Sequence, residues 1–206
     1  DKSPNYITEI PLIRRVWPGA RVVHIVRDCR DYCLSIRKAW GKDPLRAAQR
    51  WSDRVTRALA DGAALGDDHL RLHYEDLLGA PEETMRRVVA FLDLDWDPAC
   101  ATLQRSAENL GDTAGEARIV RTNVQKWRTA MDPALLRRVE SVAGDAMVRA
   151  GYAVDHPGST RLSPLQMKAA QLRDGVNLVR FDAAERGWAG AARFRWQLFR
   201  DSGAWE

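Results

Sequence analysis

The stretch Arg21–Ser35, which reads Arg-Val-Val-His-Ile-Val-Arg-Asp-Cys-Arg-Asp-Tyr-Cys-Leu-Ser, decides the fold. It opens with a run of β-branched apolar residues, which predicts a short strand buried on both faces. These residues are Val22, Val23, Ile25 and Val26. A charged cluster follows at once, in which Asp28 is a good helix N-cap and Asp31 places a second carboxylate in the first turn. The stretch therefore predicts a strand followed directly by a helix, with Arg27 at the junction.

The junction has the side chains of a phosphate site. In open α/β sheets, ligands bind at the edge where the strands end. Asp28 and Ser35 are seven positions apart, about two helical turns, so they share a face of the predicted helix. A guanidinium at the strand end and a hydroxyl on the nearby helix suit a phosphate. The alternative is an ordinary helix cap with surface charges and a solvated Ser35.

Composition narrows the class of protein. A chain of 206 residues with 45% hydrophobic and 29% charged residues is long and apolar enough for one globular domain. The net charge of +4 suits a small anionic ligand, and because basic and acidic residues are interleaved, we expect no nucleic-acid partner. We find no transmembrane segment or signal peptide and expect a cytoplasmic protein with reduced cysteines. The pairs Cys29/Cys33 and His69/His73 lack further ligands at a usual spacing, so we expect no metal.

The stretch Val-Arg-Asp-x-Arg-Asp-x-x-x-Ser, residues 26–35, resembles a known motif. It is similar to the 3′-phosphate-binding motif of sulfotransferases that use 3′-phosphoadenosine 5′-phosphosulfate (PAPS). The resemblance implies that Arg27 and Ser35 hold the 3′-phosphate of this cosubstrate.

The first residues carry a second resemblance. Asp-Lys-Ser-Pro-x-Tyr, residues 1–6, is similar to the Glu-Lys-Ser/Thr-x-x-Tyr segment of glycosaminoglycan sulfotransferases. The resemblance implies that Asp1 is the general base for the acceptor and that Lys2 stabilises the transferred group. Asp1 is one methylene shorter than the usual glutamate. The alternative is a frayed polar terminus.

Two later segments continue the resemblance. His69–Tyr74 alternates as a strand should, and Tyr74-Glu75-Asp76-Leu77 resembles the family's Tyr-Glu-Asp-Leu, which implies that Tyr74 lies near the nucleotide. Asn-Val-Gln-Lys-Trp, residues 123–127, resembles the loop that closes over PAPS in tyrosylprotein and related bacterial sulfotransferases. By this likeness Lys126 and Trp127 bind the cosubstrate, and Arg121 is a further phosphate contact. The alternatives are a buried tyrosine, and a charged loop with Trp127 as a core anchor.

The expected fold is α/β, a three-layer parallel sheet with helices on both faces, as in P-loop NTPases. We find no glycine-rich phosphosulfate-binding loop, so the resemblance covers roughly Asp1 to Tyr152, and the first strand–loop–helix of such a domain is expected to be missing. We therefore expect a sulfotransferase domain over residues 1–153 and a helical extension over 154–206. The extension is expected to pack on the body or on a second copy of the chain, which would form a homo-oligomer. A membrane surface is the less favoured alternative.

The resemblance implies an enzyme, a bacterial PAPS-dependent sulfotransferase that transfers a sulfonate group to a hydroxyl or amine. PAPS is a cosubstrate, and no metal is implied. The acceptor stays open among small molecules, carbohydrates, lipids and peptides. The alternative is a nonenzymatic or truncated module that binds PAPS, or its product adenosine 3′,5′-bisphosphate, without transferring the sulfonate.

Overall fold

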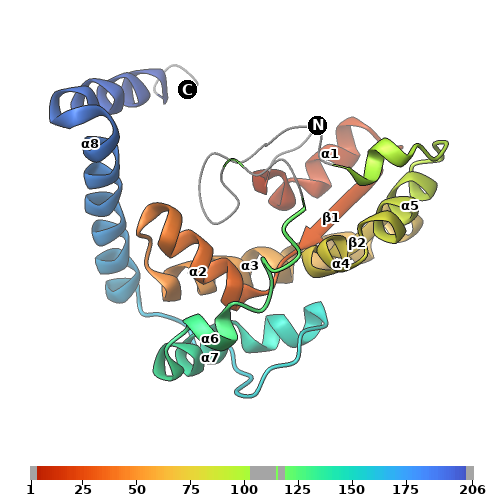
Figure 1. Cartoon of the computed structure of the whole chain (residues 1–206), viewed down its shortest axis with the longest axis horizontal. Helices are drawn as coiled ribbons and strands as arrows, with labels where there is room; N and C mark the ends of the chain where they lie inside the picture. The colour runs from red at the N-terminus through yellow and green to blue at the C-terminus, as the bar shows by residue number, and fades with distance from the viewer. Residues whose placement is uncertain (1–3, 103–114, 116–118, 203–206) are drawn as a thin grey trace.

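The computed structural model describes residues 4–102, 115 and 119–202 (Figure 1). Two strands, β1 (Val22–Val26) and β2 (His69–His73), are embedded among helices. The N-terminal helices are η1 (Pro4–Thr8), α1 (Ile10–Val16), α2 (Cys29–Trp40), α3 (Pro44–Ala63) and η2 (Gly66–Asp68). The later helices are α4 (Tyr74–Gly79), α5 (Pro81–Phe91), η3 (Pro98–Ala101), α6 (Trp127–Ala130), α7 (Pro133–Ala150) and α8 (Pro164–Ser202). The structure is thus a mostly helical α/β arrangement.

The sheet confirms the parallel pairing but is small. Within the described residues it holds only β1 and β2, paired in parallel with Val22 opposite His69 and Val26 opposite His73. The predicted burial of β1 on both faces is wrong in part. Side chains alternate along a strand, so Ile25 points to the face opposite Val26. Ile25 is 50% exposed, whereas Val26 is buried.

The helix that follows the predicted cap begins where the sequence indicates. The Asp28 side chain accepts a hydrogen bond from the Arg30 backbone N–H, and α2 ends at Gly41 in the left-handed conformation, which glycine adopts without a Cβ penalty. Asp43 accepts from two backbone N–H groups at the start of α3, which has Pro44 as its first residue. The cap at Asp28, two residues after the end of β1, thus fixes the start of α2.

The hydrophobic core lies mainly between helices. The helix α3 packs against α7 and α2, and the core gathers buried side chains from all three together with the end of β1. The largest fully buried side chains include Met147, Val139 and Val26. Since α2 starts near the end of β1 and both contribute side chains to this core, the core holds the strand–helix junction in place.

The segment between α7 and α8 runs along α7. The Asp145 N–H donates to the Gly158 carbonyl at 2.9 Å, and the Thr160 N–H donates to the Ser141 carbonyl at 2.8 Å. The approach requires glycine at position 144, because a Cβ there would lie 2.7 Å from the Pro157 Cα. We call this packed segment, residues 151–163, the strap.

The helix α8 stands at one edge of the molecule, and the part after a break turns across its end (Figure 1). The break is at Gly187, which has φ 68° and ψ 161°. The first part contacts α2 and α3. No helix in the described part of the chain is both long and apolar enough to cross a membrane.

Candidate functional site at the β1–α2 junction

Side chains from three other elements hold the backbone of the junction. The Val26 carbonyl accepts from the Tyr152 hydroxyl at 3.2 Å, and the Arg27 carbonyl accepts from the Trp51 indole N–H at 3.0 Å. The Asp28 N–H donates to Glu75 at 3.0 Å, and the other oxygen of Glu75 accepts from the Tyr152 hydroxyl at 2.9 Å. Three consecutive residues are thus fixed from α3, from α4 and from Tyr152, which lies two positions after the end of α7. Burial, and then the Glu75 charge, raise the pKa of Tyr152, so its hydroxyl keeps its proton.

The Arg27 side chain lies between α4 and the loop over residues 119–126. Its guanidinium carbon is 4.6 Å from the centre of the Tyr74 ring, a cation–π distance. Its Nη2 donates to the Asn123 backbone carbonyl at 3.2 Å, and the Asn123 amide donates to the Tyr74 hydroxyl at 3.1 Å. The Arg27 Nε is buried and has no hydrogen-bond partner in the structure. The guanidinium is therefore held in place with donor capacity to spare, which suits an incoming anion.

A buried charge network is centred on Arg30, three residues after Arg27. Arg30 bonds Asp28 through Nη2 at 2.7 Å and Glu140 through Nη1 at 2.8 Å. Burial works to lower the pKa of Arg30, but the hydrogen bonds and charges of Asp28 and Glu140 raise it on balance. Arg30 thus engages both carboxylates, whereas the Arg27 guanidinium bonds the loop at Asn123.

Asp31 and Trp127 join α2 to α6. Asp31 Oδ1 accepts from the Trp127 backbone N–H at 2.9 Å, and the Arg30 guanidinium stacks on the Trp127 ring at 3.7 Å. Burial raises the pKa of Asp31, partly opposed by that backbone hydrogen bond. Trp127 is buried in the core, so here it anchors the end of the 119–126 loop.

The structure brings some of the predicted site residues together and separates others. Arg27 and Tyr74 are in contact, while Ser35 is half-buried in α2 beyond them. Lys126 is half-buried at the start of α6. Arg121 is exposed and lines a separate cavity of about 870 Å³ with Arg86 and Trp96. Asp1 and Lys2 lie outside the described residues.

Sequence reasoning gave no role to several residues that shape the site. Asn123 and Glu75 stand inside the segments that carried the resemblance, and their place there was the available signal. Trp51 and Tyr152 had no such signal, because their partners at the junction lie 24 and 126 positions away in the chain. In the described part of the chain, no three histidine, cysteine or acidic side chains are grouped as metal ligands would be.

Comparison with known proteins supports a sulfotransferase fold. Residues 1–98 match the model of the sulfotransferase family. A Caenorhabditis briggsae sequence named as a protein-tyrosine sulfotransferase is 23% identical over 158 residues, which are 69% of this chain and 56% of that relative.

Two solved structures share the fold. The sulfotransferase domain from the curacin biosynthetic pathway is 19% identical and has a TM-score of 0.59, with 75% of this chain and 62% of that chain covered. The sulfotransferase domain from the Synechococcus PCC 7002 olefin synthase is 23% identical and has a TM-score of 0.60, with 75% and 58% covered. This chain thus spans little more than half of each relative. The match to the sulfotransferase family model covers residues 1–98, just under half of this chain.

Proposed function

We propose that the protein transfers a sulfonate group from PAPS to a hydroxyl or amine acceptor. The observation that carries the proposal is the Arg27 guanidinium, held at the carboxyl end of β1 by Tyr74 and Asn123 with a buried, unpartnered Nε. The donor set fits a phosphate. The match to the sulfotransferase family over residues 1–98 supports PAPS as the source of that phosphate.

The proposed roles divide between binding and transfer. Arg27 and Ser35 hold the 3′-phosphate, and Tyr74 lies beside the nucleotide. The loop that carries Lys126 covers it, and Trp127 anchors the end of this loop in the core. In the transfer, the acceptor oxygen or nitrogen forms a bond to sulfur and the bond from sulfur to the phosphosulfate bridging oxygen breaks. Adenosine 3′,5′-bisphosphate leaves, and the acceptor proton passes to Asp1, while Lys2 neutralises developing charge. Fixed cations at developing negative charge are the main catalytic device in such transfers.

The test is to measure the binding of adenosine 3′,5′-bisphosphate by thermal unfolding and by calorimetry. A ligand at about 100 times its Kd stabilises the native state by about 2.7 kcal/mol. We expect that stabilisation in the wild type and its loss in Arg27→Ala. The control is Arg87→Ala, which removes an exposed arginine of α5 and leaves the shift unchanged.

Two other outcomes have defined meanings. A shift of equal size in Arg27→Ala removes the 3′-phosphate from this junction. Binding without transfer from PAPS to any hydroxyl or amine acceptor supports the nonenzymatic binding module instead.

A further inference from the structure

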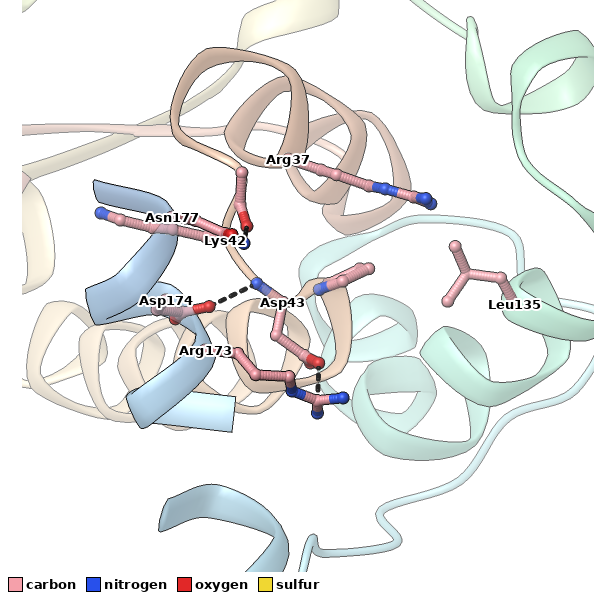
Figure 2. Close-up of a pocket in the computed structure, with 9 residues that line it drawn as sticks. Arg37, Lys42, Asp43, Leu135, Arg173, Asp174 and Asn177 are labelled. Carbon is pink, nitrogen blue, oxygen red and sulfur yellow. Dashed lines mark hydrogen bonds and ion pairs between the residues drawn. The ribbon is translucent and has the colours of Figure 1, made fainter. Parts of the chain in front are cut away.

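A second cavity, of about 450 Å³, lies at the other end of α2, where α2, α3, α7 and α8 meet (Figure 2). The helix α2 has 12 residues and is therefore about 18 Å long. Arg27 precedes its first residue, whereas the cavity is lined by Arg37 near its end and by Lys42 beyond it. The cavity is thus separate from the β1–α2 junction.

The two carboxylates at this cavity are already engaged. Asp43 caps α3 and pairs with Arg173 of α8 at 3.1 Å. Asp174 is buried, accepts from the Asp43 N–H at 2.7 Å and pairs with Arg46. Their charges are therefore matched by Arg173 and Arg46.

Positive charge remains after this pairing. In the described part of the chain, neither Arg37 nor Lys42 forms an ion pair with a carboxylate. Burial lowers the pKa of Lys42, and the charges of Arg50 and Arg46 lower it further although Asp174 opposes them. Burial likewise lowers the pKa of Arg50, together with the charges of Arg54 and Arg46. Arg46 and Arg50 repel the Lys42 ammonium, so an anion bound beside Lys42 would be stabilised.

The walls combine cations with apolar surface. Figure 2 shows Arg37, from α2, and Arg173, from α8, on either side of Asp43. The guanidinium of Arg173 has donors left after its bond to Asp43, since an arginine carries five N–H groups. Pro44 and Leu135 add apolar surface to the lining.

We propose that this cavity binds a small organic molecule that carries a phosphate or sulfate ester. Arg37, Lys42 and Arg173 hold the ester oxygens, and Pro44 and Leu135 contact the organic part. Because α8 supplies Arg173, the helical segment after residue 163 completes the site. The volume is within the usual range for small-ligand pockets, about 300–1,000 Å³.

The experiment is calorimetric titration of the full chain with phenyl phosphate and with phenyl sulfate at constant ionic strength. We expect one site in the wild type and at least about tenfold weaker binding in Arg37→Ala/Lys42→Ala, because hydrogen bonds to charged groups are lost. Arg87→Ala is the matched surface control and keeps wild-type affinity. Tighter binding of phenyl phosphate assigns a phosphate ester, and equal or tighter binding of phenyl sulfate assigns a sulfate ester.

Arg27→Ala separates this site from the proposed nucleotide site. We expect it to bind both phenyl esters as the wild type does, whatever its affinity for adenosine 3′,5′-bisphosphate. Loss of phenyl ester binding in Arg27→Ala with retention in Arg37→Ala/Lys42→Ala overturns the second site. Absence of binding in the wild type, or equal affinity in the double variant, overturns it as well. A melt followed by circular dichroism checks that the variants are folded, and Arg37→Glu, at an exposed position, repeats the test by charge reversal.

Discussion

Arg30 and Glu140 stand 110 positions apart in the chain and form a fully buried ion pair, with Arg30 Nη1 2.8 Å from Glu140 Oε1. The second oxygen of Glu140 accepts from the His156 backbone N–H at 3.1 Å. One carboxylate in the middle of α7 therefore ties the start of α2 to the strap that follows α7. The position of Arg27 depends on this connection, because Arg30 also holds the cap residue Asp28.

Replacing Glu140 by alanine tests the connection. The change leaves the buried Arg30 charge with Asp28 alone, and removing one partner of a buried pair costs about 3–5 kcal/mol. We expect a loss near the lower end of this range in the free energy of unfolding, measured with urea. The control is Glu82→Ala, which removes an exposed i,i+4 pair with Arg86 and should cost about 0.5 kcal/mol or less. A loss below 1 kcal/mol for Glu140→Ala would show that the pair does not hold the junction.

Asn123 is expected to act on ligand affinity through Arg27. Its backbone carbonyl accepts from Arg27, while its side chain bonds the Tyr74 hydroxyl. Asn123→Ala removes the side-chain bond and loosens the loop, and a lost hydrogen bond of about 1.4 kcal/mol corresponds to a tenfold change in Kd. Calorimetry with adenosine 3′,5′-bisphosphate should show this weakening. If Asn123→Ala binds as tightly as the wild type while Arg27→Ala does not, the loop takes no part in positioning Arg27.

Gly144 is expected to tolerate no side chain. A Cβ would lie 2.7 Å from the Pro157 Cα and 2.8 Å from the Gly158 backbone nitrogen, and neither atom belongs to a flexible side chain. Gly144→Ala should therefore cost about 1–3 kcal/mol of stability as overpacking, measured by thermal unfolding. Gly175→Ala is the matched control, since it is also helical and a Cβ there meets nothing within 4 Å. That control should be neutral or stabilising by up to about 1 kcal/mol, and equal effects at both positions would contradict the close approach.

Local chemistry in the sequence predicted the elements around the junction well. The β-branched run gave β1, and the cap at Asp28 gave the start of α2. Such signals are contained in a few neighbouring residues, so a single sequence suffices to read them. The burial of Ile25 was predicted wrongly, because the strand's composition does not show how many elements cover each face.

The polar framework of the site could be predicted only in part. Arg27 and Tyr74 were identified, and the structure brings them into contact. The network of Arg30 with Glu140 was not, because one glutamate in a helix with several polar residues carries no mark of burial. Long-range pairs of this kind depend on the packing of α7, which the sequence pattern does not specify.

The burial of His24 leads us to predict that the free energy of unfolding changes with pH. It is 5% exposed and neither ring nitrogen has a hydrogen-bond partner, and its ring centre is 5.7 Å from that of His69. Burial lowers its pKa from 6.5 to about 4, with further contributions from His69 and Arg71. Between these two values the unfolded chain binds a proton that the folded chain does not. The stabilisation is therefore complete above pH 6.5 and is lost as the pH falls toward 4, by at most about 3 kcal/mol.

His24→Leu should remove most of this slope. Urea unfolding between pH 4 and pH 7 should show that the free energy of unfolding depends less on pH than in the wild type. Some pH dependence should remain because burial also lowers the pKa of His69. At pH 7 the variant should be at least as stable, because a buried ring without hydrogen bonds is replaced by an apolar side chain. His156→Gln, at an exposed position, should keep the wild-type slope. A slope that survives in His24→Leu would mean that His24 is hydrated or hydrogen-bonded in solution, and the buried face of β1 would then be open to water.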